Sequence, residues 1–107
     1  MSRRLASHDV FLAIADPTRR GILDLLGAGE QPVSHLARQF DVTLSAISQH
    51  IRVLREVGLV AVRRVGRERL YRLEAQPLKE VSDWVQHYER FWQGKLDALG
   101  EHLEQNS

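Results

Sequence analysis

Apolar side chains recur at helical spacing in four successive segments of the first half of the chain, and polar or glycine-rich turns separate them. The first segment ends near Asp16 and Pro17, which suit the N-cap and the first position of a second helix. Ser34 and Thr43 are placed to cap the third and fourth helices, and Gly58 is placed to end the fourth. The pattern therefore predicts helices over residues 7–15, 17–26, 35–40 and 44–57.

The period of the apolar pattern changes after Gly58 from that of a helix to that of a strand. Residues 59–65 and 69–73 form two extended runs with Gly66-Arg67 between them, so we expect a β-hairpin with an arginine-rich tip. From Pro77 onward apolar residues recur at alternating steps of three and four, which predicts one long helix over residues 77–104. Such a helix would be roughly 40 Å long, more than one small globule covers by itself.

The third and fourth predicted helices are separated only by residues 41–43, and two helices joined by so short a turn form a helix-turn-helix. With the hairpin that follows, the expected fold is mainly α with a small β-hairpin wing, a winged helix-turn-helix. The whole chain, residues 1–107, suits a single domain that dimerises through its first and last helices. A partner copy is expected because a chain of this size buries only a modest share of its surface.

Composition argues against several functional classes. The chain has no cysteine, which removes disulfides, thiolate nucleophiles and every cysteine-ligated metal site. No apolar run is long enough for a membrane span or a signal segment, so we expect a cytoplasmic protein without membrane contact. The five histidines, including His87 one turn after Asp83, show no spacing typical of a zinc motif, and no catalytic signature stands out. We therefore expect no metal, no cofactor and no enzymatic activity.

The net charge of +1 conceals a strong segregation of charge along the chain. Residues 38–72 carry eight arginines against three acidic residues, a net charge of +5, whereas residues 1–37 are neutral and residues 73–107 carry a net −4. Arginine suits contacts with phosphates and base edges, so the central third is the expected site of nucleic-acid binding. The alternative is a solvated charged face without a partner.

The fourth predicted helix has two distinct faces when its side chains are placed at 100° per residue. Ile47, Ile51 and Leu54 fall on one side and are expected to pack on the body. The opposite side is polar and short, and there Gln49 can pair with adenine and Arg52 can reach guanine or phosphate. The hairpin arginines would hold phosphates or enter a minor groove, unless they serve only as solubilising edge charges. The predicted DNA-binding residues are Thr43, Ser45, Ser48, Gln49, Arg52, Arg63, Arg64, Arg67 and Arg69.

Aromatic side chains gather on the final predicted helix, at positions 84, 88, 91 and 92. The favoured interpretation is the core of a dimer, and the alternative is a small-molecule pocket between helices. An apolar stripe this long needs a partner to cover it, which favours a homodimer. The predicted dimer interface comprises Val10, Phe11, Leu78, Val81, Trp84, Val85, Tyr88, Phe91, Trp92, Leu96 and Leu99.

Several segments together resemble the ArsR-type family of small bacterial winged-helix repressors, and the resemblance covers almost the whole chain. Pro32 and Ser34 stand where metal-sensing members of that family place a cysteine pair, so the chain is similar to a subgroup without those ligands. The resemblance implies repression of transcription by binding to a promoter, often that of the protein's own operon. The two-fold symmetry of the expected homodimer adds that the double-stranded DNA operator should be an inverted repeat. The segments that carry it are Ala15-Asp16-Pro17-Thr18-Arg19-Arg20, residues 44–60, Gly66-Arg67 with Leu70-Tyr71-Arg72-Leu73, and the aromatic tail from Trp84 to Trp92.

Two other functions stay open from the residues alone. One is a repressor that responds to a small molecule bound at the aromatic cluster, although nothing in the sequence identifies an inducer. The other is a protein-interaction module that has kept the fold. A module that no longer binds DNA has no reason to hold a net charge of +5 around its fourth helix and hairpin, which favours the DNA-binding function.

Overall fold

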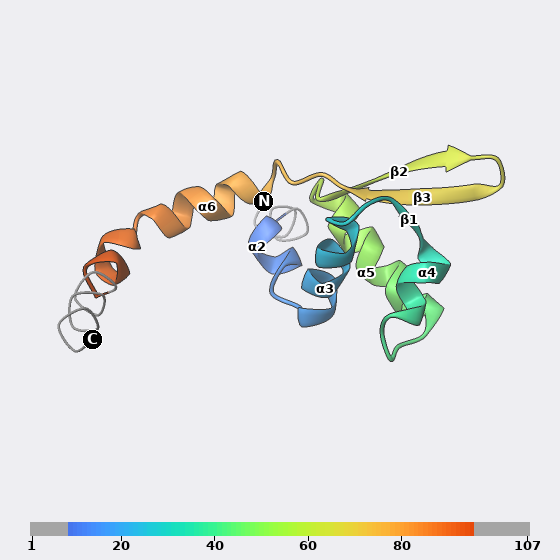
Figure 1. Cartoon of the computed structure of the whole chain (residues 1–107), viewed down its shortest axis with the longest axis horizontal. Helices are drawn as coiled ribbons and strands as arrows, with labels where there is room; N and C mark the ends of the chain where they lie inside the picture. The colour runs from blue at the N-terminus through green and yellow to red at the C-terminus, as the bar shows by residue number, and fades with distance from the viewer. Residues whose placement is uncertain (1–8, 96–107) are drawn as a thin grey trace, which may run out of the picture.

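The computed structural model describes residues 9–95 and shows a helical body with a hairpin on one side and a helix projecting on the other (Figure 1). This arrangement confirms the predicted winged helix-turn-helix. The helices of the body are α2 (Val10–Ala13), α3 (Pro17–Leu26), α4 (Val33–Arg38) and α5 (Leu44–Glu56). The remaining elements are β1 (Gln31–Pro32), β2 (Val60–Val65), β3 (Glu68–Leu73) and α6 (Leu78–Gln86).

The ends of the helices follow the predicted capping residues in three cases out of four. The Asp16 carboxylate accepts a hydrogen bond from the backbone N–H of Arg19 at 3.0 Å, and the Thr43 hydroxyl accepts one from Ala46 at 3.1 Å. Gly58 has a φ of 81° after α5, a conformation that glycine adopts without strain. The prediction for Ser34 is wrong, because α4 begins at Val33 with Pro32 at its N-cap and no side-chain cap.

Removal of the Asp16 cap should destabilise the fold. We expect Asp16→Ala to lower the free energy of unfolding by about 1 kcal/mol in urea denaturation, and Asp16→Asn to cost less because an amide oxygen still caps. The bond from Arg19 holds the pKa of the Asp16 carboxyl below its ordinary value, so the charged cap stabilises the fold above that ordinary value. This contribution is lost as the pH falls through the lowered pKa. An Asp16→Ala deficit that grows in acid would contradict this role.

The sheet has three antiparallel strands in the order β1-β3-β2, one more than the predicted hairpin. The added strand is only Gln31–Pro32, which pairs with Tyr71 and Leu70 of β3. Such a short strand has no alternating pattern to reveal it. Its pairing ties the base of the hairpin to the start of α4.

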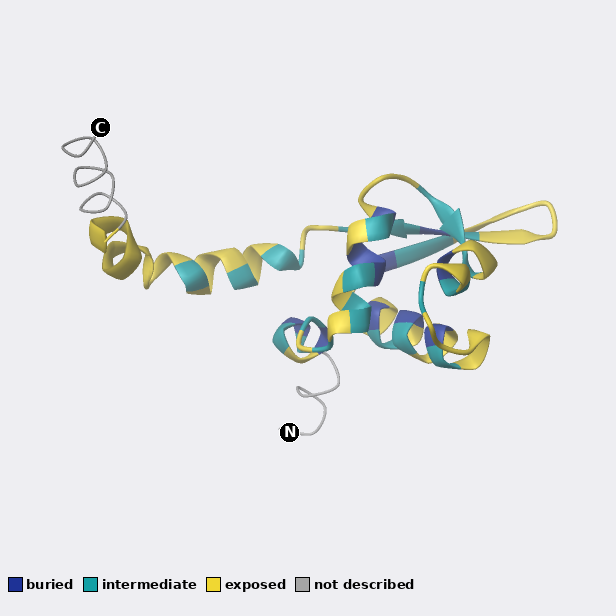
Figure 2. Ribbon diagram, turned by 60° about the horizontal axis from the view of Figure 1, so that its bottom comes forward, coloured by how far each residue is buried: buried dark blue, intermediate teal, exposed yellow. Residues whose placement is uncertain are grey.

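The core lies between α2, α3, α4, α5 and the sheet (Figure 2). Ile47, Ile51 and Leu54 are all buried, which confirms the apolar face predicted for α5. Each buried aliphatic side chain contributes about 1.5–3 kcal/mol relative to exposure. This burial fixes the rotation of α5 about its own axis and leaves the opposite face in solvent.

The final helix is interrupted where an unbroken helix was predicted. Helix α6 ends at Gln86, His87 and Tyr88 form a turn, and residues 89–95 are helical again. The backbone N–H of His87 bonds to Trp84 rather than to Asp83, and the imidazole Nδ1 of His87 lies 3.0 Å from the Asp83 carbonyl oxygen instead. The side chain therefore takes the place of one helical hydrogen bond. The predicted residues Leu96 and Leu99 lie outside the described part of the chain.

Candidate DNA-binding surface

The exposed face of α5 carries the polar side chains that the sequence predicted for base contacts. Ser45, Ser48 and Gln49 are exposed, and Thr43 is exposed at the N-cap of the same helix. Arg52 lies one turn after Ser48 with 74% of its side chain exposed, and its guanidinium Nε is 3.7 Å from the Glu56 carboxylate. A surface ion pair this loose is weak, so Arg52 can exchange Glu56 for a phosphate or a base. The face is narrow and has short side chains at its N-terminal end, which suits entry into a major groove.

The hairpin presents its arginines in two different ways. Arg64 of β2 stands directly opposite Arg69 of β3, so both point to the same side of the sheet. This side is continuous with the buried residues Val60 and Tyr71 and therefore turns toward the body of the protein. Like charges directly opposite one another repel, so an anion such as phosphate near this pair would stabilise it. Arg67 is exposed at the tip, beside Gly66.

Among the hairpin arginines predicted to bind DNA, Arg63 differs from Arg64, Arg67 and Arg69 because it already has an acidic partner. Its Nε and Nη2 atoms donate to the two carboxylate oxygens of Glu30 at 2.7 and 2.8 Å. This bidentate pair joins β2 to the segment before β1, 33 residues away in sequence. The structure thus gives Arg63 a tethering role, and its guanidinium is less available to DNA than those of Arg64, Arg67 and Arg69.

The Glu30–Arg63 pair should be visible in a titration. The hydrogen bonds from Arg63 hold the pKa of the Glu30 carboxyl below its ordinary value, and Glu30 in turn raises the pKa of Arg63. The pairing is therefore complete at pH values above the ordinary carboxyl pKa and is lost as the pH falls through the lowered one. In carboxyl-resolved NMR we expect Arg63→Gln to raise the pKa of Glu30, while Arg64→Gln leaves it in place. Equal effects of the two variants would rule out the tether.

Arg55 belongs to this surface although the sequence analysis did not select it. It lies two turns after Ser48 on the same side of α5 and lines a groove of about 310 Å³ together with Val62, Arg63, Arg64 and Arg69. The groove lies between the C-terminal end of α5 and the middle of the hairpin. The seven-residue spacing of Arg55 from Ser48 places the two on one side of the helix, and this is the sequence signal that could have identified Arg55.

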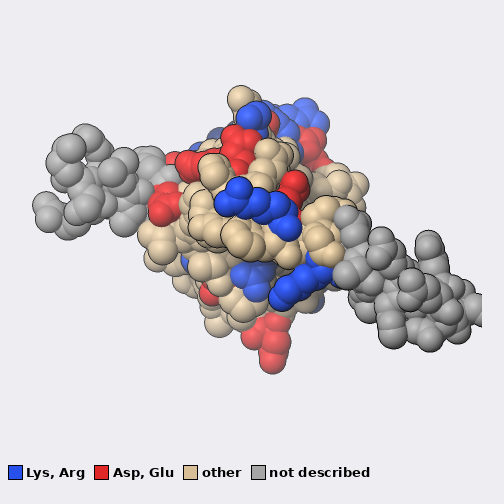
Figure 3. Space-filling model, turned by 90° about the vertical axis from the view of Figure 1, so that its left-hand side faces the viewer, with Lys and Arg blue, Asp and Glu red and all other residues tan. Residues whose placement is uncertain are grey.

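A second surface carries the aromatic side chains of α6 and of the residues that follow it. Phe11 of α2 packs edge-on against Trp84 with ring centroids 5.6 Å apart, and Trp84 packs in turn against Tyr88 at 5.4 Å. Trp84, Tyr88, Phe91 and Trp92 are all exposed large hydrophobic residues. Seen from the α6 end of the molecule, most of the surface is uncharged, and the side chains that interrupt it carry both signs (Figure 3). Such an aromatic surface is typical of an interaction site.

Other predicted members of the dimer interface differ in how much surface they offer. Val10 is 4% exposed and belongs to the core of the monomer, so its side chain has little area for a partner. Leu78 and Val81 are half-buried and pack against the same core, and Val85 is half-buried as well. The available apolar surface is therefore shifted toward the C-terminal half of the predicted stripe.

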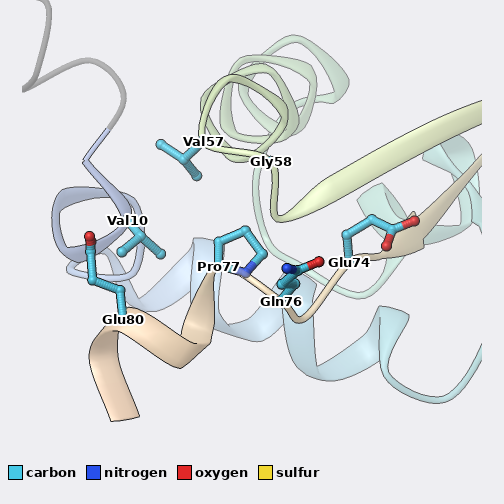
Figure 4. A pocket seen from close by; sticks show the side chains of 7 residues that line it. All are labelled: Val10, Val57, Gly58, Glu74, Gln76, Pro77 and Glu80. Atoms are coloured by element: carbon cyan, nitrogen blue, oxygen red, sulfur yellow. The ribbon is translucent and has the colours of Figure 1, made fainter. Parts of the chain in front are cut away.

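A cavity of about 550 Å³ lies next to α6, but not at the aromatic cluster (Figure 4). Its walls come from α2, the end of α5, the segment after β3 and the first turn of α6. None of the four exposed aromatic residues lines it. The residues that line it are Val10, Val57, Gly58, Glu74, Gln76, Pro77 and Glu80.

The pair Asp83 and His87, considered as metal ligands, is engaged within the protein. The Asp83 carboxylate lies 3.1 Å from the Lys79 ammonium, and the His87 ring is turned to a backbone carbonyl. Over residues 9–95 no group of three or more acidic or histidine side chains is arranged to hold a metal ion. Within the same range, no helix combines the length and the apolar character needed to cross a membrane.

Comparison with known proteins connects this geometry to a group of regulators. A helix-turn-helix domain family matches residues 14–63, which contain α3 to α5 and the start of the hairpin. The transcriptional repressor SdpR of Bacillus subtilis is 33% identical over 76% of this chain and 90% of its own length. The HTH-type transcriptional regulator Rv2034 of Mycobacterium tuberculosis is 35% identical over 97% of this chain and 94% of its own length.

Solved structures show the same likeness in three dimensions. An ArsR-like transcriptional regulator from Rhodococcus sp. RHA1 superposes with a TM-score of 0.72 at 35% identity, covering 96% of this chain and 93% of that one. A second ArsR family regulator superposes with a TM-score of 0.71 at 33% identity, covering 87% of this chain and 94% of that one. The likeness therefore extends over the helices, the hairpin and α6 together.

Proposed function

Since the chain belongs to the ArsR family of helix-turn-helix transcriptional regulators, we propose that it represses transcription as a homodimer bound to an inverted-repeat operator. One observation carries the proposal: the exposed polar face of α5 leads into the arginine-lined groove between the end of α5 and the hairpin. A helix that reads bases and arginines that hold flanking phosphates are the two parts that sequence-specific binding requires. SdpR, a relative of similar length, carries the name of a transcriptional repressor.

Each part of the surface has a distinct task in this proposal. Ser45, Ser48 and Gln49 enter the major groove and choose the sequence by hydrogen bonds to base edges. Arg64, Arg67 and Arg69 hold phosphates or the adjacent minor groove, which adds affinity with little choice of sequence. Arg63 remains paired with Glu30 and holds the hairpin in its orientation relative to the body.

The homodimer rests on the aromatic surface formed by Phe11, by Trp84 of α6 and by the aromatic residues that follow α6. Phe91 is 60% exposed, and its neighbours Tyr88 and Trp92 are nearly half exposed. Burial of such side chains against a second copy is favourable at about 25 cal/mol for each Å² of apolar surface removed from water. A two-fold axis through this surface would place one reading helix on each side, and the operator would then share that symmetry.

Selection from a random-sequence DNA library tests the proposal. We expect the protein to enrich inverted repeats whose half-site centres are about one helical turn, 10–10.5 base pairs, or a multiple of it apart. Footprinting on the DNA upstream of its own gene then tests repression of its own operon. Failure to enrich any sequence over the starting library, or enrichment of isolated half-sites without symmetry, would contradict the operator proposed here.

A further inference from the structure

Arg19 joins two helices that have separate tasks. Its Nε donates to the carbonyl oxygen of Ala13 at 2.6 Å, and its Nη2 donates to that of Leu12 at 3.1 Å, so two of its nitrogens bind the C-terminal carbonyls of α2. Its remaining nitrogen, Nη1, lies 3.3 Å from Nδ1 of His50 on α5. A guanidinium is a rigid planar fork, so the position of α2 and the position of His50 are set by one group.

His50 is next in the chain to Gln49, on the border between the buried and the exposed faces of α5. Its side chain is 22% exposed, and Nδ1 is also 4.0 Å from the Asp16 carboxylate. A guanidinium has no acceptor, so the Arg19 contact is a hydrogen bond only when Nδ1 is unprotonated. Nδ1 of His50 on α5 therefore faces the guanidinium of Arg19, which is itself held by the carbonyl oxygens at the end of α2.

Helix α2 is in turn connected to the aromatic surface. Phe11 packs edge-on against Trp84 of α6, while Val10 and Ala13 of the same helix are buried in the core. A shift of α6 against a partner copy would move Phe11, the carbonyls at the end of α2 and hence Arg19. The contacts form a continuous chain from the proposed dimer surface to the reading helix.

Arg20, the next residue after Arg19, makes similar hydrogen bonds to backbone carbonyls and therefore serves as a comparison for it. Its Nη1 donates to the carbonyl oxygens of Ile14 and Ala15 at 2.7 and 3.2 Å, so it also ties the start of α3 to the chain after α2. The hydrogen bonds found for it do not extend to α5. The two neighbouring arginines thus share a capping task, and only Arg19 adds a link to the helix that reads DNA.

We propose that Arg19 and His50 are positioning residues that couple the α2–α6 dimer surface to the placement of α5 on DNA. The proposal rests on the function proposed above, since it concerns how the reading helix is aimed. It assigns these residues no contact with DNA. It predicts that their loss lowers discrimination between sequences more than it lowers affinity for DNA in general.

The test compares Arg19→Lys with Arg20→Lys, which keep the charge but lose the planar fork. Binding is measured to a duplex that the wild-type protein selects from a random library and to a scrambled duplex of the same composition. Arg19→Lys should reduce the ratio of the two affinities by about tenfold, the scale of one hydrogen bond to a charged group, and Arg20→Lys should leave the ratio unchanged. Equal ratios for the two variants overturn the coupling, whereas a wild type without discrimination overturns the proposed function as well.

A second pair of variants changes α5 itself and leaves α2 and α3 intact. Asn at position 50 retains an acceptor close to where Nδ1 of His50 lies, whereas Phe retains a ring without an acceptor. His50→Asn should keep the wild-type affinity ratio, and His50→Phe should lower it about as much as Arg19→Lys. If His50→Phe discriminates as well as wild type while its thermal unfolding is unchanged, the hydrogen bond has no positioning role.

Discussion

Replacing Gln49 with alanine should weaken binding to the selected operator by about 1–3 kcal/mol in each half-site, a factor of about 5 to 150, and should barely change binding to scrambled DNA. The reason is that Gln49 is exposed on the face of α5 opposite its buried residues, where its amide can donate to and accept from one adenine. A side chain that reads a base edge contributes only when the correct base is present.

Arg67→Ala is the matched variant on the hairpin, because Arg67 is exposed at the tip and has no place in the groove beside α5. It should weaken binding to the operator and to the scrambled duplex alike. It should also reduce the slope of log affinity against log salt concentration by about one, for one lost phosphate contact. Binding of both variants is measured on both duplexes at several salt concentrations. If Gln49→Ala weakens the two duplexes equally while Arg67→Ala affects only the operator, the tasks of helix and hairpin are the reverse of those proposed.

Replacing Phe91 with aspartate should convert the protein to a monomer at concentrations where the wild type is a dimer. Phe91 is 60% exposed in the single chain, and an unpaired charge buried at an interface costs roughly 3–5 kcal/mol. The dimer dissociation constant should therefore rise by more than about 100-fold. Sedimentation equilibrium measures the mass, and operator affinity should fall with it because the two half-sites are no longer bound together.

Gln86→Asp supplies the control for this substitution. Gln86 is also exposed, and its replacement by aspartate introduces the same charge near the end of α6. Gln86 is not part of the series of aromatic contacts from Phe11 to Phe91. It should leave both the mass and the operator affinity near those of the wild type. A wild-type mass that stays monomeric at all concentrations, or a Phe91→Asp protein that remains dimeric, would contradict the assigned interface.

Features that depend on neighbouring residues were accessible from the sequence. The buried face of α5 and its polar opposite face follow from a helical repeat, and the caps at Asp16 and Thr43 are bonds to N–H groups three residues away. Gly58 ends α5 by its own backbone conformation. The charge segregation also required only the order of residues, and it located the arginines that line the groove.

Features that depend on distant residues were not accessible. Arg63 was grouped with the other hairpin arginines because nothing near it in sequence shows that Glu30 binds it. The short strand β1 exists only because β3 supplies partners for it, and the small exposed area of Val10, a predicted interface residue, follows from its enclosure by the core. The link between Arg19 and His50 spans 31 residues and has no local pattern.

The sequence by itself determined the helices of the body, the caps at Asp16 and Thr43, the two faces of α5 and the basic character of the central third of the chain. These are set by interactions within one or two turns of chain, whose geometry is the same in every fold. Only the tertiary structure decided which arginines are free, which apolar residues remain exposed, and how α2 reaches α5. Those properties arise when segments far apart in the chain compete for the same partner or the same space, and the outcome depends on distances that exist only after the chain has folded.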